Sequence, residues 1–167
     1  MIFTAFGAAD EVTGSKHLLN IENKRILLDC GMFQGHRQEA DDKNRHLGFN
    51  PFDVNVVVLS HAHIDHSGLL PMLVKQGYAG PIYCTPATRD LCAIMLMDSA
   101  HIQKRDSEYL SKKHMQFIPP LYTPDDVQAL MLRMVSIPYE MRFPILDGVY
   151  LTYHDAGHVL GSAMVEL

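Results

Sequence analysis

A short apolar run that leads directly into four metal-ligand side chains most constrains the fold of this chain. Residues 54–59 read VNVVVL, and the chain continues as SHAHIDHSG. An apolar run rich in β-branched residues is typical of a strand buried on both faces, as in a parallel sheet. His61 and His63 are two residues apart, so in extended backbone their side chains point the same way. Asp65 and His66 follow at the expected turn into a helix.

The residue types in this segment indicate metal binding. Neutral imidazole and carboxylate are ligands that zinc and similar metals prefer, and no thiolate accompanies them. The spacing suits two adjacent metals better than one, with His61 and His63 at the first and Asp65 and His66 at the second. A histidine-rich loop that only caps the next helix is the alternative. Four ligand-type side chains within six residues at the end of a strand favour the metal site.

The order of the other elements predicts an α/β fold. Turn residues, helix caps and apolar periodicity mark their bounds, and residues 32–51 are typical of a loop. In the helix that begins after residue 85, we expect Leu91, Met95 and Ile102 to face inward. We expect strands at 2–8, 16–21, 24–28, 54–59, 81–84, 149–154 and 162–167, and helices at 66–76, from 86 toward 113, and at 123–135.

Composition bounds the class of protein. A chain of 167 residues, 47% hydrophobic and 20% charged, is typical of one soluble globular domain. The net charge of −5 argues against a sequence-wide basic surface for nucleic acid, although a local groove is compatible with it. We find no secretory signal and no uncharged stretch near the roughly 18 residues that span a bilayer. Three cysteines without a CxxC pair predict buried thiols in a reducing, cytoplasmic setting.

Three motifs together resemble the metallo-β-lactamase superfamily. Its HxHxDH motif follows an apolar strand, as it does here, and Asp29 in LLDCGMFQG resembles the aspartate that supports the metal-binding loop. His158 in DAGHVLGSA resembles the remaining histidine of the first metal site. From the residues alone, a loop histidine flanked by Gly157 and Gly161 is as often a surface residue as a ligand. The resemblance implies the N-terminal half of a four-layer αβ/βα sandwich, a mixed sheet with helices on one face.

A finer resemblance points to one branch of that superfamily. GAADEVTGSKHLL, DCGMFQG, the stretch from DSAHIQ through PLYTPDDV, and GHVLGSA are similar to the β-CASP RNA-processing nucleases. That group includes the nuclease subunit of the cleavage and polyadenylation factor and its prokaryotic relatives. The resemblance implies zinc-dependent hydrolysis of RNA phosphodiester bonds, with RNA as the partner and two zinc ions as cofactors of the full-length parent.

The same resemblance assigns roles to individual residues. Three histidines hold the first ion, and an Asp–His pair contributes to the second. Asp65 also accepts a hydrogen bond from the attacking hydroxide, and Asp29 orients the ligand loop, which gives both residues a catalytic role. No residue is assigned to substrate binding. The implied metal ligands are His61, His63, Asp65, His66 and His158.

The family pattern continues with a metal-bridging aspartate, an RNA-clamping insertion and later histidines, which these 167 residues do not contain. We therefore expect a partial domain, 1–167, that binds one zinc at most and shows little nuclease activity by itself. We expect the run at 162–167 to leave an uncovered strand edge and to pair in a homodimer. Two alternatives stay open: a thioester or lactam hydrolase, and a non-catalytic metal- or partner-binding module.

The remaining histidines have no ligand partner at a telling spacing, and we interpret them as structural or solvated. His154, four residues before His158, is the strongest exception to test. Lys104, Arg105, Lys112 and Lys113 alternate with acids, which favours a solvated helix face over a phosphate-binding stripe. The other histidines in this group are His17, His36, His46, His101 and His114.

Overall fold

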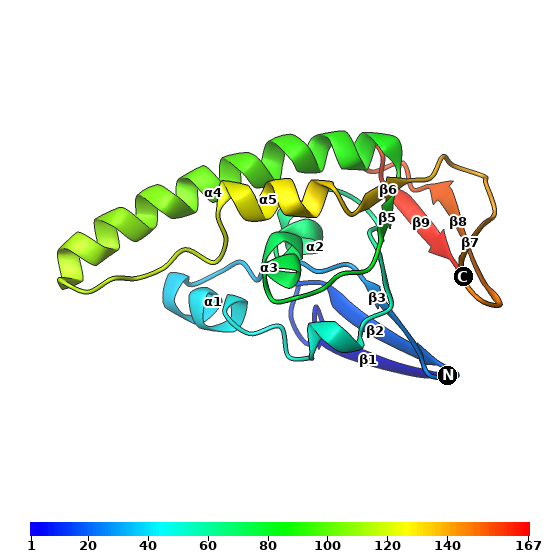
Figure 1. The fold of residues 1–167 in the computed structure, drawn as a ribbon, viewed down its shortest axis with the longest axis horizontal. Helices are drawn as coiled ribbons and strands as arrows, with labels where there is room; N and C mark the ends of the chain where they lie inside the picture. Colours follow the sequence, from blue (N-terminus) through cyan, green and yellow to red (C-terminus); the bar gives the residue numbers. More distant parts are fainter.

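Two β-sheets and one layer of helices make up the computed structural model (Figure 1). It describes residues 1–167, apart from the side chains of Arg37 and Gln38. The strands are β1 (Ile2–Gly7), β2 (Lys16–Ile21), β3 (Lys24–Leu28), β4 (Val56–Val58), β5 (Ile82–Cys84), β6 (Met134–Ser136), β7 (Phe143–Leu146), β8 (Val149–Asp155) and β9 (Ala163–Glu166). The helices are α1 (Arg37–Asn44), α2 (Ile64–Ser67), α3 (Leu70–Lys75), α4 (Pro86–His114) and α5 (Pro124–Met131), with a 3₁₀ turn at Pro51–Asp53.

The larger sheet has the strand order β1-β2-β3-β4-β5-β6. Its first three strands are antiparallel and its last four, β3 to β6, are parallel, so the expected mixed sheet is confirmed. The hairpin of β2 and β3 has the bounds that the sequence predicts. The strands β7, β8 and β9 form a separate antiparallel sheet, which the sequence pattern did not distinguish from the first.

Strand β4 separates two cores. Val57 packs with the helices on one face of the larger sheet, whereas Val56 and Val58 pack against the smaller sheet on the other face. The prediction that this apolar run is buried on both faces is confirmed. Because β3 and β4 are parallel, with Leu28 paired to Val58, the residues that follow both strands meet at one edge of the sheet. The metal-ligand motif begins at this edge.

Helix α4 lies along the top of the molecule in Figure 1 and is the longest helix of the described chain. Leu91 and Met95 pack partly against the helix-side core, but Ile102 is 45% exposed, so its predicted inward position is wrong. Ile102 lies about 200° around the helix from the buried Ala100. The fully buried stripe of α4 is Thr88, Cys92, Leu96 and Ala100.

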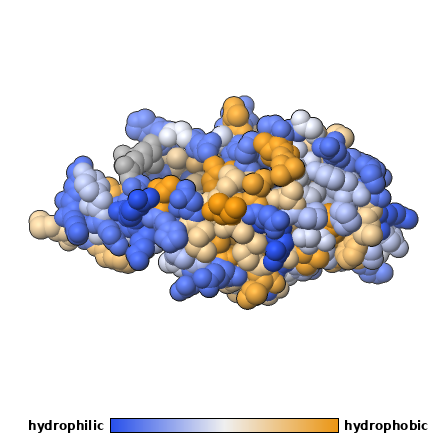
Figure 2. All heavy atoms as spheres, turned by 90° about the horizontal axis from the view of Figure 1, so that it is seen from above, coloured by the Kyte–Doolittle hydropathy of each residue, from blue (hydrophilic) through white to orange (hydrophobic). Residues whose placement is uncertain are grey.

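Apolar side chains gather in the middle of the face that carries α4, with polar side chains toward both ends (Figure 2). Ile94 and Ile102 are the exposed aliphatic side chains that α4 contributes. No helix in the described part of the chain is long and apolar enough to cross a membrane.

Three sequence expectations about the helices need correction. The helix predicted at 66–76 is divided into α2 and α3, since Pro71, the second residue of α3, has no N–H to continue the hydrogen bonding of α2. The helix predicted at 123–135 ends at Met131, and the following residues enter the parallel sheet as β6. The predicted loop at 32–51 contains α1, a polar helix without apolar periodicity. Its Asn44 side chain bonds both backbone groups of Phe33.

Candidate metal centre

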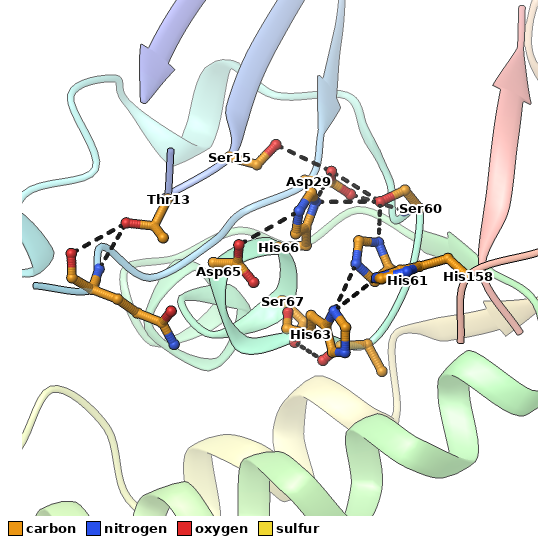
Figure 3. Close-up of polar contacts among 12 residues, drawn as sticks. Thr13, Ser15, Asp29, Ser60, His61, His63, Asp65, His66, Ser67 and His158 are labelled. Atoms are coloured by element: carbon orange, nitrogen blue, oxygen red, sulfur yellow. Dashed lines mark hydrogen bonds and ion pairs between the residues drawn. The ribbon is translucent and has the colours of Figure 1, made fainter. Parts of the chain in front are cut away.

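Asp29, directly after β3, is the anchor of the site (Figure 3). Its φ of +58° lies in the left-handed region, which aspartate tolerates better than most residues. Its backbone N–H donates to the Val58 carbonyl, which fixes the turn against the end of β4. The carboxylate then reaches the metal-ligand loop, where Oδ1 accepts the backbone N–H of Ser60 at 2.8 Å.

The backbone after Asp29 also holds the loop that carries the HxHxDH motif. The N–H of Cys30 donates to the His66 carbonyl at 2.8 Å, and the N–H of Met32 donates to the Ile64 carbonyl at 3.0 Å. Between them, a Cβ atom on Gly31 would overlap the carbonyl oxygen of Asp65. The DCG sequence thus allows a close approach of backbone to backbone, which places the ligand loop against the end of β3.

Three histidine side chains converge on one point (Figure 3). His61 Nε2 and His158 Nε2 each lie 3.2 Å from His63 Nδ1, and one ring nitrogen from each residue lies within 4.8 Å of the others. Nitrogens bound at 2.0–2.1 Å to one tetrahedral zinc are about 3.3 Å apart. The spacing of these atoms therefore matches a single zinc-sized ion. Among the described residues, this is the one group of three or more His, Cys, Asp or Glu that converges so closely.

His158 comes from the smaller sheet, in the loop between β8 and β9. Its backbone N–H donates to the Ser162 hydroxyl at 3.1 Å, which closes the loop on itself. The N–H of Ala163 donates to the Ser60 carbonyl at 2.9 Å and joins the start of β9 to the ligand loop. The site therefore lies where the ends of the two sheets meet.

Asp65 and His66 form a pair beside the three histidines. His66 Nδ1 is 2.7 Å from Asp29 Oδ2, and His66 Nε2 is 3.7 Å from Asp65 Oδ2. The rings of His61 and His66 have centroids 4.1 Å apart, so the pair adjoins the histidine cluster. In Figure 3, Asp65 lies on the opposite side of His66 from His158. The structure thus brings together all five predicted ligands, three in one cluster and two next to it.

The two histidines nearest to Asp29, His61 and His66, have pKa values shifted in opposite directions. Burial, together with the neighbouring His66, lowers the pKa of His61 to about 4, so its imidazole is neutral near pH 7. Burial also acts to lower the pKa of His66, but the hydrogen bond to Asp29 and the charge of Asp29 outweigh it, and the pKa is raised. A neutral His61 is the form that binds a metal.

Ser60 is a site residue that the sequence reasoning missed. Its hydroxyl lies 3.0 Å from Asp29 Oδ2 and 2.9 Å from His61 Nδ1, so it connects the two. The signal was its position, immediately before the first histidine of the motif. Ser15, in the loop between β1 and β2, is a second such residue. Its hydroxyl donates to Asp29 Oδ2 at 3.2 Å, whereas Glu11 of the same loop pairs with Lys43.

His154 does not join the cluster. Its Nδ1 lies 3.0 Å from the Glu140 carboxylate and its Nε2 lies 2.7 Å from the Glu166 carboxylate, so both ring nitrogens are engaged elsewhere. These contacts agree with the interpretation of His154 as structural or solvated and not as a ligand. Beside His158, a pocket of about 520 Å³ opens between the start of α4 and the β8–β9 loop. Its lining is mainly apolar and includes Pro86, Tyr139 and Leu160.

Comparison with known proteins identifies the superfamily to which the chain belongs. The sequence model of the Metallo-beta-lactamase superfamily matches residues 11–160, and the chain belongs to this superfamily. The chain is 40% identical over 165 residues to Ribonuclease TTHA0252 of Thermus thermophilus, covering 99% of this chain and 34% of that protein. It is 36% identical to transcription termination factor FttA of Methanothermobacter thermautotrophicus, covering 98% of this chain and 24% of that protein. The chain thus spans about a third or less of the length of these relatives.

Solved structures confirm the fold. A metallo-β-lactamase of Cronobacter sakazakii, a HARLDQ-motif mutant, aligns with a TM-score of 0.55 and 18% identity, covering 95% of this chain and 52% of that chain. The subclass B3 metallo-β-lactamase MEM-A1 from a soil metagenome aligns with a TM-score of 0.51 and 21% identity, covering 90% of this chain and 50% of that chain. The fold is consistent with the N-terminal half of the metallo-β-lactamase fold. Membership of the superfamily implies a divalent metal, commonly zinc, and the three-histidine group could bind it.

Proposed function

We propose that residues 1–167 form part of a metallo-β-lactamase domain in a zinc-dependent RNA phosphodiester hydrolase of the β-CASP branch. The observation that carries the proposal is the convergence of His61, His63 and His158 in a chain 40% identical to a protein named as a ribonuclease. Because the chain spans 34% of that relative, the proposed activity is that of the whole protein.

In this proposal the three histidines hold the first ion through His61 Nε2, His63 Nδ1 and His158 Nε2. The donor set suits zinc, since three imidazole nitrogens are a ligand set that a catalytic zinc would use, with water or substrate as its remaining ligand. When bound, a divalent metal polarises the phosphoryl group and makes a water molecule acidic enough to attack near neutral pH. His61 is suited to bind a metal because its imidazole is neutral near pH 7.

Asp65 and His66 provide part of a second site, and Asp65 accepts a hydrogen bond from the attacking water. The 3.7 Å between Asp65 Oδ2 and His66 Nε2 is compatible with both groups contacting one ion. Two protein ligands seldom hold a transition metal tightly, so we expect one zinc at most on these residues. Asp29 acts through others: it holds His66 and Ser60, and thereby the ligand loop.

RNA is the substrate class that the two relatives favour, one named as a ribonuclease and the other as a transcription termination factor. The pocket beside His158 offers room for a group next to the scissile phosphate. We propose a reducing, cytoplasmic setting, which is supported by the three buried, unpaired thiols. Burial raises the pKa of Cys30 and Cys92 to about 12, so these thiols are protonated and unreactive.

The whole protein, incubated with zinc and separately with a labelled RNA, a thioester and a β-lactam, tests the proposal. We expect chelator-sensitive cleavage of the RNA alone, lost in His63→Ala and kept in His154→Gln. Hydrolysis of the thioester or the lactam without RNA cleavage would establish a small-molecule hydrolase instead. A zinc-loaded protein that cleaves none of the three would be a non-catalytic module.

A further inference from the structure

Ser60 is the one hydroxyl that touches both Asp29 and a histidine of the three-histidine cluster in the described structure. From this contact we infer that Ser60 is a positioning residue, which holds the ring hydrogen of His61 on Nδ1 and so leaves Nε2 free to bind the metal. The inference rests on the proposed role of His61 as a ligand. The carboxylate of Asp29 then sets the position of the ring hydrogen on His61 through Ser60, and on His66 directly.

The direction of the Ser60 hydroxyl follows from Asp29. The carboxylate receives four hydrogen bonds, from the Ser15 hydroxyl, the Ser60 N–H, the Ser60 hydroxyl and the His66 ring. An ionised carboxylate only accepts hydrogen bonds, so the hydrogen of the Ser60 hydroxyl points to Oδ2, 3.0 Å away. A hydroxyl has one hydrogen, and toward His61 Nδ1, at 2.9 Å, Ser60 therefore acts as the acceptor.

The hydrogen on His61 must then lie on Nδ1. Its Nε2 carries the lone pair and faces His63 Nδ1 at 3.2 Å, inside the cluster. The opposite tautomer would direct an Nε2–H into the cluster and would require Ser60 to donate to the ring. Asp29, which is 6% exposed, would then lose a charge-assisted hydrogen bond that water cannot easily replace. The tautomer of His61 with its hydrogen on Nδ1 is therefore favoured.

The same carboxylate acts directly on His66. The His66 Nδ1–H donates to Asp29 Oδ2 at 2.7 Å, and the contact of this nitrogen with the Ser60 hydroxyl is longer, at 3.5 Å. His66 Nε2 therefore faces the Asp65 carboxylate. Removal of the serine hydroxyl should disturb His61 and spare His66, whereas removal of the Asp29 charge should disturb both.

Long-range ¹H–¹⁵N NMR of the histidine rings in the metal-free protein tests the inference without any enzyme assay. We expect the Nδ1–H tautomer of His61 in the wild type and in Ser60→Thr, which keeps the hydroxyl. We expect a mixture with the Nε2–H form in Ser60→Ala. Ser15→Ala is the matched control, because Ser15 also donates to Asp29 but touches neither ring.

Zinc affinity, measured by competition with a chelating dye, is the second readout. Loss of an outer hydrogen-bond partner of a ligating histidine weakens binding by about 10- to 100-fold, which we expect for Ser60→Ala. Ser60→Thr and Ser15→Ala should stay near the wild-type affinity. An Nε2–H tautomer of His61 in the wild type, or a Ser60→Ala variant unchanged in tautomer and affinity, would overturn the inference. Failure to cleave RNA would refute the proposed function and leave the tautomer result standing.

Discussion

The backbone carbonyl oxygen of Gly161 accepts a hydrogen bond from the Thr85 hydroxyl at 2.7 Å. The Thr88 hydroxyl donates to the same oxygen at 2.9 Å. Thr85 caps α4 and Gly161 lies three residues after His158, so these two bonds tie the histidine loop of the smaller sheet to the first turn of the long helix. The position of the third histidine therefore depends on a contact outside the cluster.

Gly161→Ala should disrupt this contact. A Cβ atom there would lie 2.5 Å from the Thr88 nitrogen and 2.8 Å from the Thr85 hydroxyl, and the φ of +84° strains any L side chain. We expect a loss of about 3 kcal/mol in the free energy of unfolding, measured with urea, and weaker zinc binding. Gly157→Ala is the control: its φ is also positive but its Cβ meets nothing within 4 Å, so about 1 kcal/mol is expected. Equal losses in the two variants would contradict this account of the Gly161 contact.

Substitution of single histidines should show which of them bind the metal, because only the loss of a ligand should weaken zinc binding. His63→Ala removes the nitrogen that faces both His61 and His158, and we expect zinc affinity to fall by at least about 100-fold. His154→Ala leaves the cluster intact and should keep the wild-type affinity. Elemental analysis of the dialysed 167-residue chain should find one zinc at most, and two zinc ions per chain would show that Asp65 and His66 suffice for a second site.

The stability of the smaller sheet should depend on pH through His154. Hydrogen bonds to Glu166 and Glu140 raise the pKa of His154 above its ordinary value of 6.5. A group with a raised pKa in the folded state stabilises the protein below its unfolded-state pKa, and the contribution is lost as pH rises through the folded-state pKa. The melting temperature of the wild type should therefore exceed that of His154→Gln at about pH 5.5, and the difference should vanish near pH 9. A difference that grows with pH would refute this role.

Strand β9 should mediate self-association, as we expected from the sequence. It is an edge strand in which Met164 is 58% exposed, and Leu167, which follows the strand, is 43% exposed. Exposed strand edges pair readily with other chains, and a charge on the edge opposes such pairing. We expect a dimer at micromolar concentration by sedimentation velocity, and a monomer for Met164→Lys. Leu132→Lys, at a 90% exposed position away from β9, should remain dimeric. A monomeric wild type would exclude the proposal.

The sequence predicted the larger sheet well because its strands carry local signals. The β2–β3 hairpin alternates around a turn, and the apolar run of β4 is buried on both sides. Elements held by distant contacts were missed. The polar helix α1 depends on the bonds between Asn44 and Phe33, and β6 is a strand because it pairs with β5. Neither partner is visible in the local sequence.

The site shows the same division. His61 and His63 were recognised from their spacing, since neighbouring ligands leave a pattern. His158 is 95 residues from His63, and the residues alone left open whether it is a ligand or a surface residue, so the family resemblance was needed to select it. Ser60 was missed because its importance lies in where one hydroxyl hydrogen points, which depends on Asp29 at a distance of 31 residues. The metal-binding roles of these residues stay predictions until zinc binding is measured.

The three histidines lie in loops that belong to two different sheets. An ion held by them would therefore link the two sheets, in addition to any part that it takes in the reaction. It would join segments 95 residues apart and would bind only the folded chain. By thermodynamic linkage, free zinc at 100 times its dissociation constant adds about 2.7 kcal/mol to the free energy of unfolding. A chelator should therefore loosen the smaller sheet and expose its loops to proteases. Zinc scarcity would then shorten the lifetime of the protein, apart from any effect on catalysis.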